Sequence, residues 1–266
     1  MLTFESLLEQ AKLRGMPANK MRGVLREYLQ ILILNEIYKS RPGRTLFFTG
    51  GTYLRLVHGL KRFSEDLDFY SNLISQKQFE LLMKSVSLEL SRVGIKSTVK
   101  FSHWDNMLVC ALAFPEIESK YGIISQYSKV SGIVIKAEVN KPKWKVRSES
   151  QAISGMGCFF PCLCTVISIL FADKIDALLK KNRARHIYDI IFMLSGKYPI
   201  DNNLLKLYGL GQKPLDVIKE RISQFSKAEL ERHAENLRPF LFDEKESALI
   251  ASAKSFIPLL TEKYTS

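Results

Sequence analysis

Apolar positions recur with helical spacing in some parts of the chain and alternate with polar ones in others. Helical spacing covers residues 4–39, with a break at Gly15-Met16-Pro17, and returns over Gln76–Val93. Short apolar or alternating runs predict strands, and the residues after His58 form a turn. The expected strands are Thr45–Thr49, Asp66–Tyr70, Lys96–Ser102, Met107–Phe114 and Ile133–Asn140, with a short helix over Thr52–His58 and a loop or insertion over residues 115–131.

After about residue 160 only the helical period remains. The expected helices are Thr165–Leu179, Ala184–Leu194, Leu204–Leu207, Pro214–Phe225, Lys227–Leu237 and Glu244–Leu260. The pattern therefore predicts an α+β fold, in which a mixed sheet with flanking helices (residues 1–160) precedes a helical bundle domain (residues 161–266).

Two carboxylates in the second expected strand carry the strongest chemical signal. Asp66 and Asp68 are one residue apart, so they share a face of the strand while Leu67 and Phe69 face a core. Two adjacent anions favour a hard divalent cation, and Mg²⁺ is usually bound by one or two carboxylates together with phosphate. The upstream Gly50-Gly51-Thr52 lets the backbone approach a ligand and would aim helical N–H groups at phosphate. Together these residues indicate a site that handles a nucleotide.

The whole stretch Gly50–Phe69, in this order and spacing, resembles the AbiEii-type toxin nucleotidyltransferases of the nucleotidyltransferase superfamily. The resemblance implies a toxin of a toxin–antitoxin or abortive-infection system that uses a nucleoside triphosphate and Mg²⁺ or Mn²⁺. It implies that Asp66 and Asp68 hold the metal and that Gly50, Gly51 and Thr52 cradle phosphate. In this family the acceptor is the 3′ end of tRNA, and an antitoxin is the cognate partner.

The strand Ile133–Asn140 supplies a third candidate carboxylate. Its apolar residues take one face, and Glu138 lies on the other. In the superfamily a neighbouring strand contributes a further acid, so Glu138 either completes the metal site or acts as the base. The alternative is a solvated glutamate paired with Lys136 or Lys141.

A second segment also resembles the family. Lys174 matches a lysine suited to a triphosphate, and Asp189 matches the final acid of the motif that opens the next helix. The resemblance implies that the helical domain contributes both residues to the cleft, Asp189 by holding Lys174 or by acting as the base. The alternatives are a surface ion pair for Lys174 and a pair with Arg185 for Asp189. His186 departs from the pattern, because an acid is common there.

Two further residues of the main motif admit two roles each, and a third has one. Arg55 either contacts phosphate or makes a structural ion pair, and Ser64 either donates to phosphate or caps a turn. Arg62 is expected to be structural.

Charge points towards a nucleic acid partner. The chain carries a net charge of +12, of which residues 197–266, with 11 basic and 10 acidic residues, hold only +1. Two basic stretches are candidates to face RNA: Lys141–Arg147, where Trp144 is placed to stack on a base, and Lys180–Arg185. The alternative for each is a solvated face.

Composition excludes several classes. The four cysteines lack zinc-ligand spacing and are expected to be reduced thiols. No apolar run is long enough to cross a bilayer, and the first residues do not form a signal peptide, so a cytoplasmic protein without a membrane partner is expected. Besides RNA nucleotidyl transfer, two functions stay open: transfer to a small-molecule or protein hydroxyl, and a non-catalytic nucleotide-binding module.

Overall fold

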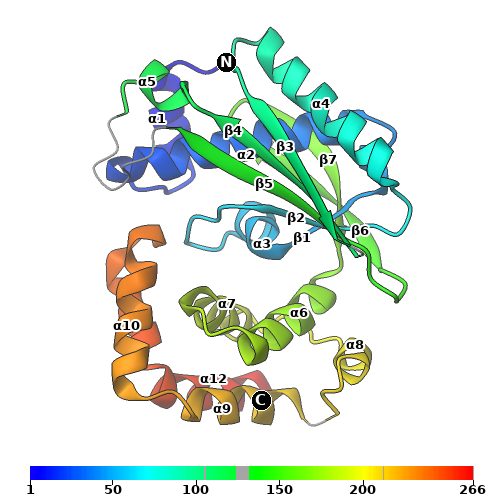
Figure 1. Cartoon of the computed structure of the whole chain (residues 1–266). Coiled ribbons are helices and arrows are strands. Elements are labelled where there is room, and N and C mark those ends of the chain that lie inside the picture. The colour runs from blue at the N-terminus through cyan, green and yellow to red at the C-terminus, as the bar shows by residue number, and fades with distance from the viewer. Residues whose placement is uncertain (105, 124–131, 212, 266) are drawn as a thin grey trace. The chain divides into compact units, whose positions relative to one another are not determined.

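A computed structural model describes residues 1–104, 106–123, 132–211 and 213–265. The chain divides into two compact units (Figure 1). Unit 1 comprises Met1–Gly59 and Phe63–Thr165, and unit 2 comprises Leu60–Arg62 and Val166–Ser266. The division at Thr165 lies at the end of a strand, five residues beyond the boundary expected from the sequence.

Unit 1 is built around a seven-stranded mixed sheet with the order β3-β4-β5-β2-β1-β7-β6. Parallel pairs join β2 to β5 and β1 to β7, and the other neighbours are antiparallel. The strands are β1 Phe47–Thr49, β2 Leu67–Tyr70, β3 Thr98–Trp104, β4 Met107–Phe114, β5 Ile133–Asn140, β6 Ser148–Gly155 and β7 Cys158–Thr165. The five strands expected from the sequence are present, whereas β6 and β7 were not predicted.

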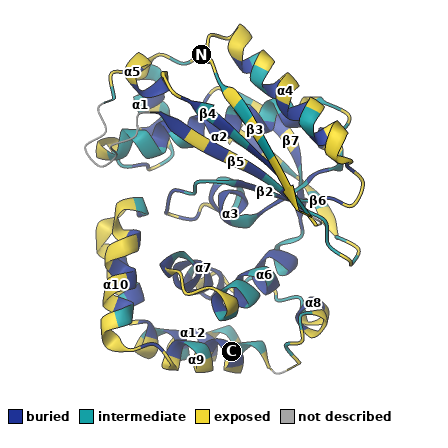
Figure 2. Cartoon of the chain, in the orientation of Figure 1, coloured by how far each residue is buried: buried dark blue, intermediate teal, exposed yellow. Residues whose placement is uncertain are grey.

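Helices of unit 1 supply the core on one face of the sheet. The buried face of β5 holds Ile133, Ile135, Ala137 and Val139, and the alternate residues are more exposed, as the banding of this strand in Figure 2 shows. The long helices α2 and α4 pack on the sheet, and α3 packs on β1 and β2. The helices are α1 Phe4–Leu13, α2 Met21–Lys39, α3 Gly50–His58, α4 Gln76–Arg92 and α5 Ile117–Lys120, with 3₁₀ turns at Ala18–Lys20 and Gly43–Thr45.

The loop expected over residues 115–131 contains the short helix α5, and its part over 124–131 lies outside the described residues. The break predicted at Gly15-Met16-Pro17 separates α1 from α2. Gly15 there has a φ of +66°, which glycine adopts without the cost that a side chain brings.

Unit 2 is helical, as predicted. Its helices are α6 Ile167–Lys180, α7 Ala184–Ser195, α8 Asn202–Leu207, α9 Pro214–Ser223, α10 Lys227–Leu237, α11 Ser247–Ala251 and α12 Ala253–Thr265, with 3₁₀ turns at Arg238–Phe240 and Glu244–Glu246. The short segment Leu60–Arg62 belongs to this unit, because Arg62 forms a β-bridge with Leu241 and the Lys61 carbonyl accepts from the Phe242 amide.

The four cysteines are free thiols, and Cys110, Cys162 and Cys164 are buried. In the described part of the chain, no helix is long and apolar enough to cross a membrane.

Candidate nucleotidyltransferase site

The two motif aspartates lie where the segment after α3 enters the sheet. Asp68 is in β2, between the buried Leu67 and Phe69, and Asp66 comes directly before the strand. The Thr52 hydroxyl donates to the Asp66 carbonyl at 2.5 Å. Thr52 is fully buried, and its side chain ties α3 to this segment.

Gly50 connects the loop to the carboxylate. It opens α3 with a φ of +81°, and a Cβ built there would lie 2.1 Å from Oδ2 of Asp68. The Asp68 carboxylate therefore packs directly over the Gly50 backbone, and any side chain at position 50 would displace it. Gly51 follows as a buried residue of the same helix turn. The structure thus brings the glycine loop and Asp68 together as one site.

Glu138 joins the same row of the sheet. The parallel pairing of β2 with β5 places Glu138 directly beside Asp68, and neighbouring residues in register point to the same face. On the other side of β2, Thr49 of β1 pairs with Asp68. The register therefore places the third candidate carboxylate on the strand next to the aspartate pair.

The carboxylates of this site meet only part of what a metal ion requires. Within the described residues, no group of three or more His, Cys, Asp or Glu side chains is arranged to hold a metal ion. Asp66 and Asp68 alone offer two carboxylates, a number sufficient for Mg²⁺ when substrate phosphates complete its coordination. These residues fit a cation that arrives with a nucleotide.

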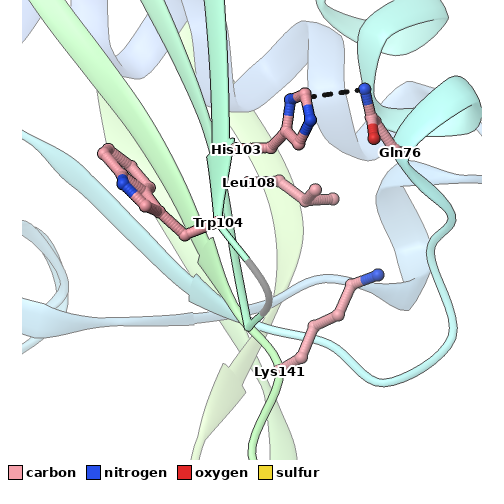
Figure 3. A pocket seen from close by; sticks show the side chains of 5 residues that line it. All are labelled: Gln76, His103, Trp104, Leu108 and Lys141. Atoms are coloured by element: carbon pink, nitrogen blue, oxygen red, sulfur yellow. Dashed lines mark hydrogen bonds between the residues drawn. The ribbon is translucent and has the colours of Figure 1, made fainter.

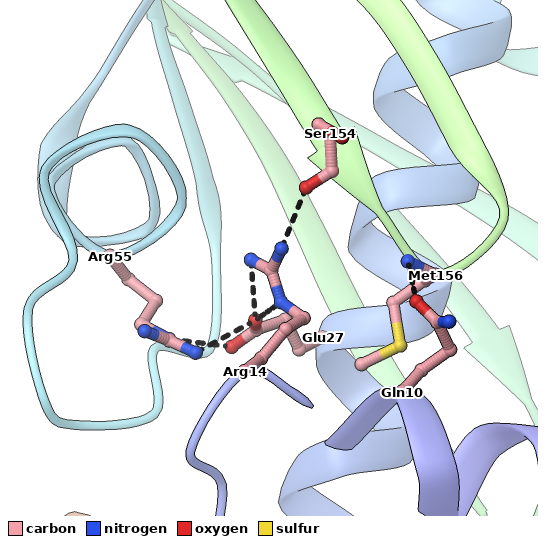
Figure 4. Close-up of polar contacts among 6 residues, drawn as sticks. All are labelled: Gln10, Arg14, Glu27, Arg55, Ser154 and Met156. Atoms are coloured by element: carbon pink, nitrogen blue, oxygen red, sulfur yellow. Dashed lines mark hydrogen bonds and ion pairs between the residues drawn. The ribbon is translucent and has the colours of Figure 1, made fainter. Parts of the chain in front are cut away.

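Arg55 has a structural partner inside unit 1 (Figure 4). Its Nε and Nη2 donate to Glu27 of α2 at 2.9 and 3.2 Å, and both side chains are buried. Arg14 also pairs with Glu27 and donates to the Ser154 carbonyl at 2.7 Å. The sequence suggested an ion pair for Arg55 as one of two roles but did not identify Glu27. A glutamate within the apolar positions of α2 was the available signal.

Ser64 lies in the segment between α3 and β2. Its carbonyl accepts from Nε2 of the buried Gln30 at 3.1 Å, and the neighbouring Glu65 pairs with Arg26 at 3.2 Å. These contacts attach the approach to β2 to helix α2.

Lys174 and Asp189 come together in unit 2, with Arg62 as a third member. Lys174 Nζ lies 2.8 Å from Oδ2 of Asp189, and Arg62 donates from Nε and Nη2 to the two carboxylate oxygens at 2.8 Å each. Asp189 has no exposed surface, and Lys174 is 8% exposed. Although burial opposes ionisation, the two cations hold the pKa of Asp189 well below its usual range.

Two roles were considered for Asp189: holding Lys174, or acting as the catalytic base. A fully buried carboxylate held by two cations is poorly suited to accept a proton, so this arrangement favours the role of holding Lys174. The pair with Arg185 considered as an alternative is replaced by pairs with Arg62 and Lys174. The sequence spacing could not show the Arg62 contact, which joins residues 127 positions apart.

His186 follows the same helix face one turn before Asp189. It is 6% exposed, and neither ring nitrogen has a hydrogen-bond partner. Burial, and then the charge of Lys174, lower the pKa of His186 to about 3. At neutral pH this side chain is therefore an uncharged imidazole beside an ion-paired cluster.

A pocket of about 600 Å³ lies at the end of the β3–β4 hairpin (Figure 3). It is lined by Gln76, His103, Trp104, Leu108 and Lys141. Leu108 pairs with Val139 and with His103, so these two lining residues lie on the face opposite Glu138 and Asp68, whereas Trp104, which also lines the pocket, lies on the carboxylate face. The sequence did not identify Trp104, which lies two residues beyond the expected strand Lys96–Ser102 and inside the observed β3.

Comparisons with known proteins found a matching family model and solved structures of similar fold. The family model described as the nucleotidyl transferase AbiEii toxin of a type IV toxin–antitoxin system matches residues 32–259. No curated protein matches. The nucleotidyltransferase toxin MenT4 from Mycobacterium tuberculosis is similar in structure, with a TM-score of 0.60, 19% identity and coverage of 98% of this chain and 90% of that one. The crystal structure of JHP933 from Helicobacter pylori has a TM-score of 0.57, 17% identity and coverage of 92% and 94%.

The two structural likenesses show a shared fold. Because the family match spans most of the sequence and includes the glycine loop, both aspartates, Lys174 and Asp189, the chain belongs to the AbiEii family of nucleotidyl transferase toxins.

Proposed function

We propose that this nucleotidyltransferase transfers a nucleoside monophosphate from a nucleoside triphosphate to a hydroxyl of RNA, the 3′ end of tRNA being the acceptor that the family resemblance suggests. The packing of the Asp68 carboxylate over the Gly50 backbone carries the proposal, because it makes the phosphate loop and the carboxylates one site. We expect the reaction to occur in the cytoplasm and to be opposed by a cognate antitoxin.

Each group then has a stated task. The α3 N-terminus at Gly50 and Gly51 offers backbone N–H groups to the triphosphate. Asp66 and Asp68 would hold Mg²⁺ or Mn²⁺ together with the phosphates, and such a cation would supply charge neutralisation for the leaving pyrophosphate. The acceptor oxygen bonds to the α-phosphorus, the bond to the β-phosphate oxygen breaks, and pyrophosphate leaves.

Glu138 is the carboxylate that we assign to the proton of the acceptor hydroxyl, since it lies beside Asp68 in register. The family resemblance is our reason for assigning Lys174 to the charge of the triphosphate; within unit 2, Asp189 holds the Lys174 ammonium and is itself held by Arg62. The contacts of Arg55 and Thr52 support structural roles for both.

The alternative of a small-molecule acceptor is disfavoured by charge. Cationic substrates of such enzymes favour an acidic protein, whereas this chain carries +12.

The test is to incubate the purified protein with total cellular RNA, Mg²⁺ and each α-labelled nucleoside triphosphate in turn. Label should enter RNA with the wild type, and Asp68→Asn and Glu138→Gln should each lower the rate by at least about 100-fold, in the range of lost acid–base catalysis. Asp176→Asn, which alters a carboxylate in an exposed ion pair, is the matched control. Absence of label in RNA with every donor, from folded protein, would reject the proposal.

A further inference from the structure

In the row of the sheet next to Asp68 and Glu138, two strands carry an aromatic residue. Moving two residues along each strand keeps the same face. Tyr70 pairs with Asn140, Asn140 with Met107, and Met107 with Trp104. Tyr70 and Trp104 therefore lie on the carboxylate face, three strand spacings or roughly 14 Å apart across the sheet.

Trp104 is an unusual residue for this position, because 61% of it is exposed. It points to the opposite side of the strand from His103, whose ring contacts Gln76, the first residue of α4 (Figure 3). An indole ring this exposed adds little to the core. It is, however, available to a ligand on the face that holds the carboxylates.

The second tryptophan joins the same row. The Trp144 ring packs edge-on against Tyr70, with centroids 5.4 Å apart, and the Trp144 carbonyl accepts from Asn72 at 3.5 Å. The loop that carries Trp144 follows β5 directly and includes the exposed Lys143 and Lys145. Positive charge thus accompanies aromatic rings, the combination that binds single-stranded nucleic acid.

The direction of β1 separates this row from the phosphate loop. Thr49 pairs with Asp68 and Phe47 with Tyr70, so β1 runs from the aromatic row to the carboxylate row and then into Gly50. The triphosphate loop is on one side of the carboxylates, and the aromatic row is on the other. Because the attacking and leaving oxygens are roughly in line, an acceptor would approach from the side of the carboxylates away from the loop, which is the side of the rings.

We propose that Trp104, Tyr70 and Trp144 form a stacking platform for unpaired bases at the 3′ end of the acceptor RNA, with Lys143 and Lys145 binding its backbone. The proposal rests on the proposed function, since it requires a nucleic acid acceptor. It adds that the acceptor end must be single-stranded, because a base paired in a duplex does not offer a free face for stacking on a ring.

Intrinsic fluorescence provides a direct test, because the chain has only two tryptophans and both belong to the platform. A single-stranded RNA oligonucleotide titrated into full-length protein without donor should change the tryptophan emission. Trp144→Phe isolates the Trp104 signal, and Trp104→Phe isolates that of Trp144. A blunt duplex of the same length should give a weaker response.

Affinity is measured in parallel by anisotropy of the labelled oligonucleotide. Trp104→Leu should weaken binding roughly 5- to 100-fold, the range expected for one lost base stack, while Trp104→Phe keeps most of the affinity. Phe159→Leu is the matched control, since Phe159 is a strand aromatic of unit 1 that is 77% exposed. Binding of the nucleoside triphosphate with Mg²⁺, followed by calorimetry, should change less than twofold in each variant.

The outcomes separate the two proposals. If the wild type labels RNA but Trp104→Leu binds and labels like the wild type, the platform is rejected and the proposed function stands. Loss of triphosphate affinity with unchanged RNA affinity would assign the ring to the donor base and reject the platform. A wild type that neither binds nor labels any RNA would reject both.

Discussion

Gly50 shows how one residue type can be required for two separate reasons. Its φ of +81° favours glycine over any other residue, and the Asp68 carboxylate occupies the space of a Cβ. Gly59, at the other end of α3, has a φ of +78° but nothing within 4 Å of a built Cβ. The two glycines therefore share the backbone requirement and differ only in the contact.

This difference gives a matched prediction. Gly50→Ala and Gly59→Ala should each destabilise the fold by about 1–2 kcal/mol, the cost of a left-handed alanine. Only Gly50→Ala should abolish nucleotidyl transfer, because it displaces Asp68. Urea unfolding and the RNA labelling assay measure the two effects, and equal activity of the two variants would contradict the close packing of Asp68 on Gly50.

His186 predicts a dependence of stability on pH. Its pKa falls from 6.5 to about 3 on folding, so the unfolded chain binds a proton in this interval that the folded chain does not. The free energy of unfolding is therefore unaffected by His186 above pH 6.5. As the pH falls below this value, it decreases by up to about 1.4 kcal/mol per pH unit. The lowered pKa of Asp189 acts in the same direction, but only below about pH 4.

His186→Leu should therefore flatten the decline in the free energy of unfolding between pH 6.5 and 4. At pH 7.5 the variant should be as stable as the wild type or more stable, since it removes two buried nitrogens that lack partners. Urea titrations at a series of pH values check both statements. A steeper decline in the variant, or a large loss at pH 7.5, would show that the imidazole has a partner in solution.

At the scale of elements, α6, α7 and the segment Leu60–Arg62 are joined by a single buried carboxylate. Lys174 comes from α6, Asp189 from α7 and Arg62 from the turn after α3. Removing the charge of the Asp189 carboxylate leaves the buried Lys174 and Arg62 without this anion. The loss in unfolding free energy is far larger than that from losing a surface ion pair.

Asp189→Asn should accordingly cost about 3–5 kcal/mol in unfolding free energy. Asp176→Asn, which removes the partner of the 63% exposed Lys180 side chain on the same helix, should cost less than about 0.5 kcal/mol. Thermal and urea unfolding of both variants make the comparison. Similar small losses in both would mean that the cluster is solvated in solution.

Elements differ in how far local sequence determined them. Both ends of β4 and β5 agree with the prediction, because β4 is a continuous apolar run and β5 alternates in burial. Strands β6 and β7 were missed. In β6 only Ile153 is fully buried, and β7 contains Pro161, which argues against a strand on sequence grounds. Their mutual pairing decides their structure, and Pro161 lies beyond the single Phe48–Cys164 pair with β1.

At the scale of the whole molecule, charge predicts how the acceptor binds. Most of the net charge of +12 belongs to the first 196 residues, so RNA binding should release counterions. The KM for RNA should rise steeply between 50 and 200 mM salt, with a logarithmic slope of about 0.7 for each phosphate contacted. The KM for the triphosphate should change much less, and a salt-insensitive KM for RNA would favour a small or protein acceptor.

The sequence by itself determined the family, the α+β class with a helical C-terminal part, and the residues of the glycine loop and aspartate motif, because these depend on local order and period. Only the tertiary structure decided that Glu138 stands beside Asp68, that Asp189 is held by Arg62 as well as Lys174, and that Trp104 shares a face with the carboxylates. Strand order, register and buried ion pairs between distant segments depend on the simultaneous packing of many side chains, and no local pattern in the chain encodes them.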